Sequence, residues 1–269
     1  MYPRTNHQPD QPILDVRHLS VNYEGRGALD NITFHLHTGE RVAVVGPNGA
    51  GKSTLFKVVA GVMPPTSGEV KISGYGPRGH ICIAYVPQRS QVDWRFPASV
   101  ADVVMMGRIG QVGWFRWPRR ADWDIVHAAL EAVGMDPLAN RQIGELSGGQ
   151  QQRTFLARAM AQEAELVLLD EPLNGLDTPS QEAILSLLDK LRQQTITVMV
   201  ATHDLGQAAS HFDRVMLLNH QLIRLGLPQD VLTSANLLRA YGGHAQLILG
   251  EGGTATLIDT CCDGDAEHE

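Results

Sequence analysis

The strongest constraint on the fold is a glycine-rich segment that follows a short apolar run. Residues 46–54 read GPNGAGKST, directly after the apolar run RVAVV at 41–45. A continuous apolar run of this length is typical of a strand buried in a parallel sheet. Glycines permit backbone bends that turn successive N–H groups toward an anion, and a helix beginning near Lys52 adds its partial positive charge. This strand–loop–helix context predicts a P-loop, the cradle for nucleotide phosphates.

The residue types of this loop indicate how a nucleoside triphosphate is held. Lys52 can place its ammonium between the β- and γ-phosphates, Ser53 offers a hydroxyl to Mg²⁺, and Thr54 can reach the α- or β-phosphate. A chance glycine turn is the alternative, and the complete motif in its context favours ATP binding over it. The predicted phosphate-binding residues are Gly46, Pro47, Asn48, Gly49, Ala50, Gly51, Lys52, Ser53 and Thr54.

A second apolar run ends in two carboxylates. Residues 166–171 read LVLLDE, which predicts a central strand with Asp170 and Glu171 at its carboxyl end. Open α/β sheets place their ligands at that edge. Asp170 is expected to hold Mg²⁺, through water, and Glu171 to accept a proton from the attacking water. A plain core strand followed by an acidic turn is the alternative, and the upstream P-loop favours the catalytic interpretation.

The apolar pattern along the chain predicts an α/β fold with an inserted helical segment. Residues 13–37 alternate apolar and polar side chains, as half-buried strands do. Residues 89–162 show helical patterns and no convincing strand, and strand–helix alternation then returns and suggests βαβ units. Residues 228–241 are expected to form two short helices. We expect one domain over residues 13–249, between a flexible leader at 1–12 and a flexible acidic tail at 250–269.

Composition narrows the class of protein. The 269 residues suit one large α/β domain or two closely joined subdomains, and the formal net charge of −7 argues against a nucleic-acid partner. With three cysteines, no disulfide framework is indicated, which favours a reducing compartment. The first residues do not form a secretory signal. The apolar runs are strand-sized, whereas spanning a bilayer takes about 20 apolar residues, so another subunit would have to supply any membrane path.

The segment LSGGQ at 146–150, followed by QQR, resembles the signature of ABC transporter ATPases. The resemblance extends over about residues 13–241. It implies a P-loop NTPase core, in which a mostly parallel sheet is joined by an antiparallel β subdomain, and an inserted helical subdomain at about 89–162. It also implies the activity of an ATP hydrolase whose cofactors are ATP and Mg²⁺.

Four further positions match motifs of the same family. Tyr23 resembles the aromatic residue that stacks on adenine, and Gln88, in YVPQ, resembles the glutamine that senses the γ-phosphate and Mg²⁺. Asp177, in NGLD, resembles the aspartate that communicates across a dimer, and His203, in ATHDL, resembles the histidine that contacts the γ-phosphate. Each of them could instead be an ordinary core or loop residue. The order and spacing of all the motifs together favour the family interpretation.

The signature predicts a dimer. Ser147, Gly148 and Gly149 would open a helix that continues through Gln150, and its N-terminus offers N–H groups and a hydroxyl to an anion. In ABC ATPases these groups lie far from the P-loop of their own chain. The resemblance therefore implies a head-to-tail dimer with a second ATPase subunit, expected to be a second copy, in which each signature binds the ATP of the other chain.

The middle of the chain resembles one subgroup of the family. Residues 92–108 (VDWRFPASVADVVMMGR), 113–118 (GWFRWP) and 236–248 (NLLRAYGGHAQLI) resemble the ATPases of manganese, zinc and iron importers. All four tryptophans fall between residues 94 and 123, as in a groove that docks a membrane subunit, although core packing of individual rings is equally expected. The implied partners are a transmembrane permease and, through it, an extracytoplasmic metal-binding protein. The implied location is cytoplasmic, at the inner face of the cell membrane.

Two other functions remain open at this point. One is a soluble ABC ATPase that acts on DNA or ribosomes, and the other is the ATPase of an exporter, or of an importer with another cargo. The tail adds a separate question, because cysteines, acids and histidines can bind transition metals. Adjacent cysteines are awkward ligands for a closed tetrahedral site, and a solvated acidic end is the favoured interpretation. The tail residues concerned are His244, Cys261, Cys262, Asp263, Asp265 and His268.

Overall fold

The computed structural model describes residues 11–23, 25–76, 83–113 and 116–242, together with the backbone of two further strands at 245–249 and 255–259. Residues 1–10 of the expected leader at 1–12 lie outside the described residues, as do Trp114, Phe115, His244 and the cysteines of the tail. Within the described part, no helix combines the length and the apolar character that crossing a membrane requires.

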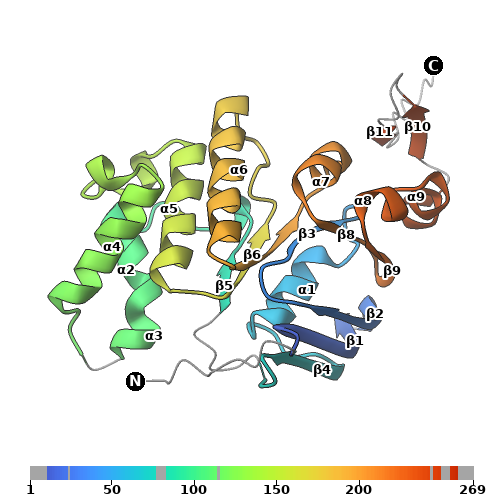
Figure 1. The fold of residues 1–269 in the computed structure, drawn as a ribbon, viewed down its shortest axis with the longest axis horizontal. Coiled ribbons are helices and arrows are strands. Elements are labelled where there is room, and N and C mark those ends of the chain that lie inside the picture. Colours follow the sequence, from blue (N-terminus) through green and yellow to red (C-terminus); the bar gives the residue numbers. More distant parts are fainter. Residues whose placement is uncertain are drawn as a thin grey trace, which may run out of the picture.

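A six-stranded sheet forms the centre of the molecule (Figure 1). Its first five strands in spatial order are parallel, and the last pairs antiparallel at the edge. Three of the parallel strands are buried along their whole length, which explains their unbroken apolar sequences. In spatial order the strands are β5 (Ile83–Val86), β6 (Leu166–Asp170), β7 (Thr197–Ala201), β3 (Arg41–Val45), β8 (Arg214–Asn219) and β9 (Gln221–Gly226).

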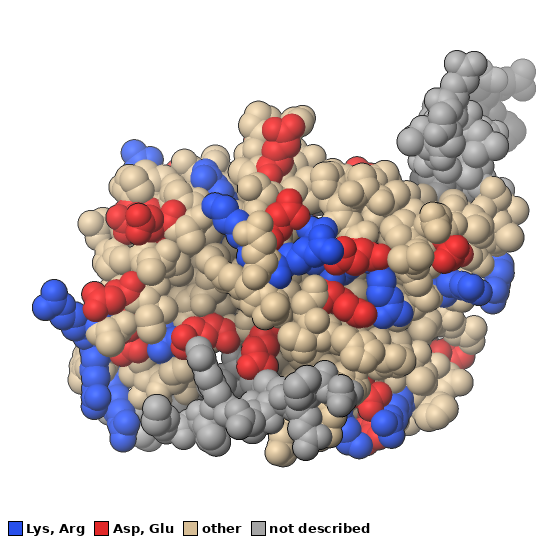
Figure 2. Space-filling model, viewed as in Figure 1, with Lys and Arg blue, Asp and Glu red and all other residues tan. Residues whose placement is uncertain are grey.

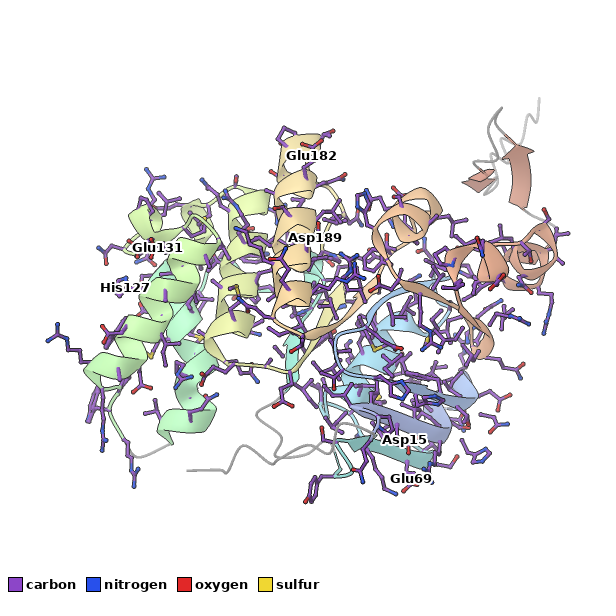
Figure 3. The ribbon with its side chains drawn as sticks, viewed as in Figure 1. Asp15, Glu69, His127, Glu131, Glu182 and Asp189 are labelled. Atoms are coloured by element: carbon purple, nitrogen blue, oxygen red, sulfur yellow. The ribbon has the colours of Figure 1, made fainter. Side chains whose placement is uncertain are left out.

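A smaller antiparallel sheet lies beside the centre. It comprises β1 (Leu14–Tyr23), β2 (Arg26–Leu36) and β4 (Ser67–Ile72), with β1 in the middle. Buried and exposed residues alternate along β2, as the sequence predicted for half-buried strands. On the solvent side, Asp15 and Glu69 lie on the neighbouring strands β1 and β4 (Figure 3). The expected fold class, a mostly parallel core with an antiparallel β subdomain, is confirmed.

Two apolar cores lie on opposite faces of the central sheet, because alternate residues of β3 belong to different cores. Val42 and Val44 pack with helix α1 (Lys52–Val59) and the antiparallel sheet. Ala43 and Val45 pack in the other core. That second core also contains residues of α6 (Thr178–Gln193), α7 (Leu205–His211), α8 (Pro228–Val231) and α9 (Ser234–Tyr241).

The helical insertion forms the lobe at the left of Figure 1. In residues 89–162, the described part contains helices and connecting turns and no strand, as the sequence predicted. The α-helices are α2 (Val100–Met105), α3 (Ile109–Val112), α4 (Arg120–Ala132) and α5 (Gly148–Ala161). Short 3₁₀ turns lie between them, at Arg89–Gln91, Met106–Arg108, Asp136–Leu138 and Ile143–Glu145.

Three strands were not predicted. β9 is an edge strand without a buried residue, so its sequence QLIRLG lacks the apolar pattern of the central strands. The other two, β10 (Ala245–Leu249) and β11 (Ala255–Asp259), pair with each other as an antiparallel hairpin. β11 lies within the segment 250–269 for which a flexible tail was expected. The two short helices expected at 228–241 are α8 and α9.

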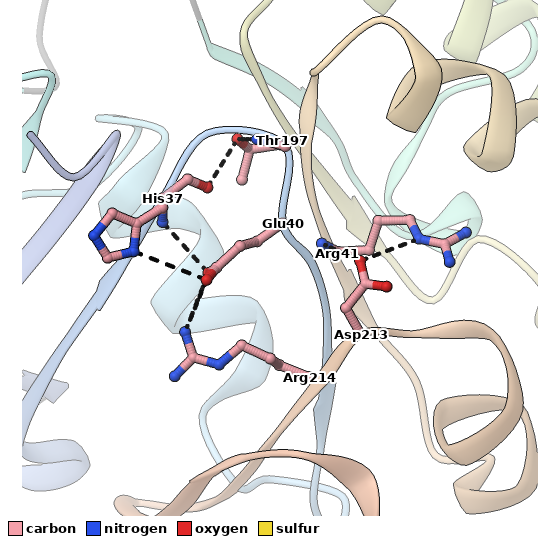
Figure 4. A network of polar contacts seen from close by, with 7 residues as sticks. His37, Glu40, Arg41, Thr197, Asp213 and Arg214 are labelled. Carbon is pink, nitrogen blue, oxygen red and sulfur yellow. Dashed lines mark hydrogen bonds and ion pairs between the residues drawn. The ribbon is translucent and has the colours of Figure 1, made fainter. Parts of the chain in front are cut away.

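A polar network joins the amino ends of the central strands (Figure 4). Arg214 donates to the carboxylate of Glu40 at 3.1 Å, and the backbone N–H of Arg41 donates to Oδ2 of Asp213 at 3.2 Å. The Thr197 hydroxyl donates to the carbonyl of His37 at 3.4 Å. Arg41 also pairs with Asp189 on α6, which Figure 3 labels. These contacts brace one edge of the sheet and leave the opposite, carboxyl edge for the P-loop.

Candidate functional site

A cavity of 680 Å³ opens at the carboxyl edge of the central sheet. It is bounded by the loop after β3 and by residues that follow β5, β6 and β7. The fold therefore gathers at one edge several motifs that lie far apart in the sequence. The residues that line the cavity are Ala28, Gly46, Pro47, Asn48, Gly49, Ala50, Gly51, Lys52, Ser53, Thr54, Gln88, Glu171, Asn174, His203 and Tyr241.

The phosphate loop is held closely from outside. A Cβ on Gly46 would lie 2.0 Å from the carbonyl oxygen of Leu218, so this position requires glycine. The N–H of His220 donates to the carbonyl of Ala50 at 2.9 Å. Gly51 has a φ of 95°, and its Cβ would lie 2.5 Å from the carbonyl oxygen of Ala28. The turn between β8 and β9 and the strand β2 thus fix the loop in a shape that leaves its concave side open.

Lys52 begins helix α1 and is buried, with 6% of its surface exposed. Its Nζ donates to the carbonyl oxygens of Gly46 at 2.7 Å and Pro47 at 3.0 Å. Burial lowers the pKa of the ammonium, and the carboxylates of Glu171 and Asp170 oppose that shift. The ammonium is therefore inside the loop and close to the acidic residues after β6.

Asp170 and Ser53 form a pair of oxygen donors. Asp170 is the last residue of β6 and is 2% exposed. Burial raises the pKa of its carboxyl, and a hydrogen bond from Ser53 acts in the opposite direction. The Tyr85 hydroxyl also donates to Oδ2 of Asp170, at 3.4 Å. A carboxylate and a hydroxyl fit Mg²⁺, which prefers oxygen ligands and keeps several waters.

Glu171 is oriented by two amide side chains. Gln88 Nε2 donates to Oε2 of Glu171 at 2.8 Å, and Asn174 Nδ2 donates to the same oxygen at 3.1 Å. The backbone of Glu171 has a φ of 51°, in the left-handed region, and its N–H donates to the carbonyl of Ala201 at 3.0 Å. This strained conformation turns the carboxylate from the end of β6 into the cavity. The structure thus brings Gln88 and Glu171 into direct contact.

His203 also lines the cavity, as expected. It follows β7 and precedes α7, in a turn where the N–H of Asp204 donates to Oγ1 of Thr202 at 3.1 Å. The Asp204 carboxylate then caps α7 by accepting from the N–H of Gln207 at 2.9 Å. This capped turn fixes the place of His203 beside the phosphate loop.

Tyr23 is not among the described residues that line the cavity. Its hydroxyl donates to Sδ of Met63 at 3.2 Å. The ring is 42% exposed at the end of β1. Ala28, on the paired strand β2, lines the cavity instead.

The signature residues form a second cluster, where the start of α5 in the helical lobe meets the start of α6. Ser147 is the N-cap of α5, and it exchanges hydrogen bonds with Gln150 in a capping box. A Cβ on Gly149 would lie 2.5 Å from the Ser180 hydroxyl, whose hydrogen bond to Asp177 lowers the pKa of that carboxyl. Gly148 is the first residue of the helix. None of the predicted residues of this cluster is among the described residues that line the cavity; they are Ser147, Gly148, Gly149, Gln150 and Asp177.

Three residues of the cavity were not predicted as site residues. Ala28 comes from β2, Asn174 from the loop after β6, and Tyr241 from the last turn of α9. A signal existed for Asn174, since it lies three residues after Glu171 in the loop that precedes Asp177. For Tyr241, the resemblance of residues 236–248 to metal-importer ATPases was a signal of the subgroup and did not point to the nucleotide cavity, about 190 residues away in sequence.

Comparison with known proteins identifies similar sequences. Residues 29–174 match the profile of the family described as "ABC transporter". The manganese transport system ATP-binding protein MntB of Halalkalibacterium halodurans is 47% identical over 87% of this chain and 93% of its own length. The zinc transport system ATP-binding protein TroB of Treponema pallidum is 44% identical over 86% of this chain and 87% of its own.

Solved structures show the same similarity. A metal-chelate type ABC transporter in an inward-facing conformation aligns with a TM-score of 0.77 and 32% identity, over 92% of this chain and 96% of the other. The cbiO1 protein of Clostridium perfringens, part of the transporter complex cbiONQ, aligns with a TM-score of 0.71 and 30% identity, over 86% of this chain and 94% of its own.

Proposed function

This chain belongs to the ABC transporter family of ATPases, and on that premise we propose that it is the ATP-hydrolysing subunit of an importer for divalent transition-metal ions. The observation that carries the proposal is one cavity lined by the complete phosphate loop and Glu171, with Asp170 close enough to act on the charge of Lys52. Relatives at 44% to 47% identity bear names that specify manganese, zinc or chelated iron transport.

The geometry supports a definite division of roles at the ATP site. The backbone N–H groups of residues 46–54 and the ammonium of Lys52 would bind the phosphates, because charge-assisted hydrogen bonds are strong in a partly dry site. Ser53 and Asp170 would hold Mg²⁺, which neutralises phosphate charge during the reaction. The Lys52 ammonium has three N–H donors and uses two of them on the carbonyls of Gly46 and Pro47, so a third would be available to a phosphate.

Glu171 is the proposed general base for the attacking water. Its carboxylate faces the cavity and accepts hydrogen bonds from Gln88 and Asn174, which fix its orientation. Gln88 would also contact Mg²⁺ and sense the γ-phosphate, so ligand binding would compete with its bond to Glu171. His203 would contact the γ-phosphate from the turn after β7.

The signature cluster supports a head-to-tail dimer. Ser147, Gly148, Gly149, Gln150 and Asp177 lie together around the N-terminus of α5 and do not line the cavity of the described chain. A helix N-terminus with a serine cap suits an anion. We infer that this cluster completes the ATP site of a second copy. ATP then joins the two chains and hydrolysis separates them, which drives a conformational cycle in a partner.

That partner would be a transmembrane permease, served by an extracytoplasmic metal-binding protein. Relatives of this chain are named as ATP-binding proteins of transport systems, and on that basis this chain would lie at the inner face of the cell membrane. Trp117 is 90% exposed and Phe96 is 57% exposed, both on the helical lobe that begins after Gln88. Exposed aromatic residues are enriched at protein interfaces. Trp94 is different, because it packs edge-on against Phe155 and fills the lobe.

The competing function is an ABC ATPase that acts on nucleic acid. The face shown in Figure 2 carries acidic and basic side chains next to each other, without a continuous basic area. A nucleic-acid surface would need such an area, since it neutralises a row of phosphates. The names of the relatives also favour metal import over another cargo.

The decisive experiment compares two variants of the purified chain. Lys52→Ala should weaken ATP binding and stop turnover. Glu171→Gln should retain ATP binding and lose hydrolysis by about 10²–10⁴-fold, the usual contribution of a general base. Light scattering with Mg²⁺ and ATP should show the Glu171→Gln chain as a dimer, because ATP stabilises the state that binds it. Undiminished hydrolysis in either variant would contradict the assigned roles.

A further inference from the structure

A second, smaller cavity adjoins the nucleotide cavity. Its volume is 90 Å³, and three of its residues, Glu171, Asn174 and His203, also line the nucleotide cavity. Two half-buried glutamines line the smaller cavity as well, Gln181 on α6 and Gln207 on α7. None of the proposed catalytic or binding roles uses either glutamine, although both line the same cavity as the proposed general base.

The amide of Gln181 holds the turn that follows the general base. Its Nε2 donates to the carbonyl oxygens of Leu173 and Leu176, each at 3.2 Å. Carbonyl oxygens only accept hydrogen bonds, so the nitrogen of the amide has to face them. The two carbonyls flank Asn174, which donates to Oε2 of Glu171 at 3.1 Å. One side chain therefore fixes both ends of the four-residue turn 173–176, from which Asn174 orients the carboxylate.

The oxygen of the same amide is joined to another element. Gln207 Nε2 donates to Oε1 of Gln181 at 3.2 Å. Gln207 also donates its backbone N–H to the Asp204 carboxylate, which caps α7 directly after His203. Gln181 thus connects the turn 173–176 with the turn that contains His203, although the two turns follow different strands, β6 and β7.

We propose that Gln181 is a positioning residue for ATP hydrolysis, which fixes the turn 173–176 relative to the His203 turn. The inference rests on the proposed function, in which Glu171 accepts a proton from the attacking water and His203 contacts the γ-phosphate. Gln181 acts through Asn174 and Gln207, and it is not among the described residues that line the nucleotide cavity. Because small errors in the placement of reacting groups lower the rate, its loss should slow hydrolysis and leave nucleotide affinity intact.

The test compares Gln181→Met and Gln181→Glu with the wild-type chain. Methionine is similar in size and shape to glutamine and donates no hydrogen bond, so kcat should fall on the order of tenfold, the equivalent of one or two hydrogen bonds. Glutamate places a carboxylate against two carbonyl oxygens and should lower kcat further. The affinity for an ATP analogue with an imido group between the β- and γ-phosphates, measured by calorimetry with Mg²⁺, should stay within about twofold for both variants.

Two results would overturn the proposal. One is a wild-type kcat in Gln181→Met, which would mean that the side chain only fills space. The other is a nucleotide affinity that falls in step with kcat, which would mean that the substitution damages the binding site as a whole. Thermal unfolding of each variant, with the assays run well below the midpoint, separates a slower reaction from a loss of folded protein.

Gln207→Met tests the connection to the His203 turn. It removes one of the three hydrogen bonds of the Gln181 amide and should lower kcat less than Gln181→Met does. In the double variant it should add nothing to the effect of Gln181→Met, because the contact is already lost. Fully additive effects would contradict the connection. Gln193→Met makes the same change at an exposed position of α6 and should leave kcat unchanged.

Lys52→Ala separates a failure of this inference from a failure of the proposed function. If Lys52→Ala hydrolyses ATP at the wild-type rate, the proposed function itself fails. If Lys52→Ala is inactive while Gln181→Met keeps the wild-type kcat, the ATPase assignment stands and only the role of Gln181 is refuted.

Discussion

At the scale of single residues, the site contains ionisable side chains that are buried, where the charged form is less stable than in water. Burial raises the pKa of Asp170 and lowers that of Lys52, so each group is less easily charged here than in water. The two shifts have the same origin, which is loss of solvent at the end of β3 and β6. Nucleotide and Mg²⁺ would supply the missing partners. The unliganded site is therefore expected to reduce the stability of the fold in return for binding capacity.

Replacing Asp170 by Asn tests that expectation. A raised carboxyl pKa means that the folded state binds more protons than the unfolded state, from the ordinary pKa of aspartate up to the raised value. The contribution of Asp170 to folding stability therefore declines as the pH rises through that window, and at neutral pH the charged group is destabilising. Asp170→Asn should raise the melting temperature of the ligand-free chain at pH 7, by about 2–4 °C if about 1 kcal/mol is recovered.

The same variant should lose what the charge provides. Mg²⁺-dependent ATP hydrolysis should fall to background, because an amide is a poor ligand for Mg²⁺. Asp124→Asn, an exposed aspartate on α4, is the matched control and should change neither property. A lower melting temperature for Asp170→Asn would mean that the hydrogen bonds from Ser53 and Tyr85 outweigh the cost of burial.

Residue-level prediction from sequence succeeded where one short segment carries the chemistry. Lys52, Asp170 and Glu171 each follow or end a buried strand, and the parallel sheet then brings strand ends together without further information. Ala28 and Tyr241 could not be found in that way. They reach the cavity because β2 and α9 pack on opposite faces of the sheet. The sequence around each residue does not indicate what its element packs against. The proposed adenine contact of Tyr23 stays a prediction.

At the scale of elements, helix α5 combines a structural and a proposed functional role in one residue. The Ser147 side chain caps the helix and forms a capping box with Gln150. Helix α2 begins in the same way, with Ser99 as N-cap and Asp102 as its partner. Both helices belong to the helical lobe, but the N-terminus of α2 contributes no signature motif. The chain thus contains its own control for the effect of losing a cap.

Ser147→Ala and Ser99→Ala should therefore differ in activity and agree in stability. Each loses a serine cap, which costs about 0.5–2 kcal/mol of folding free energy. Only Ser147→Ala should impair ATP hydrolysis, by about 10²-fold if its hydroxyl stabilises the transition state as a preorganised donor does. Thermal unfolding and steady-state hydrolysis of both purified variants give the comparison. Equal activity of the two variants would show that Ser147 acts through capping alone.

A strand could be predicted from sequence where its burial produces a regular pattern of apolar residues. Strands buried along their whole length, such as β3 and β6, have unbroken apolar sequences and were located within one residue. β9 pairs on one side only and has no buried residue, so its apolar side chains carry no readable period. Within the described residues, the strands β10 and β11 pair only with each other, so no alternation imposed by a neighbouring sheet was available to predict them.

At the scale of the molecule, the two edges of the central sheet have different tasks. The amino edge is closed by ion pairs that connect β3 and β8 with α6, through Arg41, Asp213 and Arg192. The carboxyl edge is open and holds the cavity. The signature cluster lies where the helical lobe meets the start of α6, apart from that cavity. In the proposed dimer, one chain would present an ATP-binding half and a signature half, and a second copy would be needed to use both.

The last prediction concerns the metal cargo, and it is tested at an exposed aromatic side chain of the helical lobe. Trp117 projects from the helical lobe with 90% of its surface exposed, so it can be replaced without a cost in packing. If it docks the permease, Trp117→Ala should leave the ATPase activity of the isolated chain unchanged and reduce transport in cells. Val62→Ala is the matched control, because Val62 is also exposed, at 67%, but lies outside the helical lobe.

Cells without this chain, grown in metal-poor medium, should contain less manganese, zinc or iron by elemental analysis. Cells with Trp117→Ala should show the same deficit, and cells with Val62→Ala should not. Normal contents of all three metals, together with a defect in sugar, amino-acid or phosphate uptake, would contradict the cargo and leave the ATPase untouched, because the cavity at the carboxyl edge has no part in selecting what the permease carries.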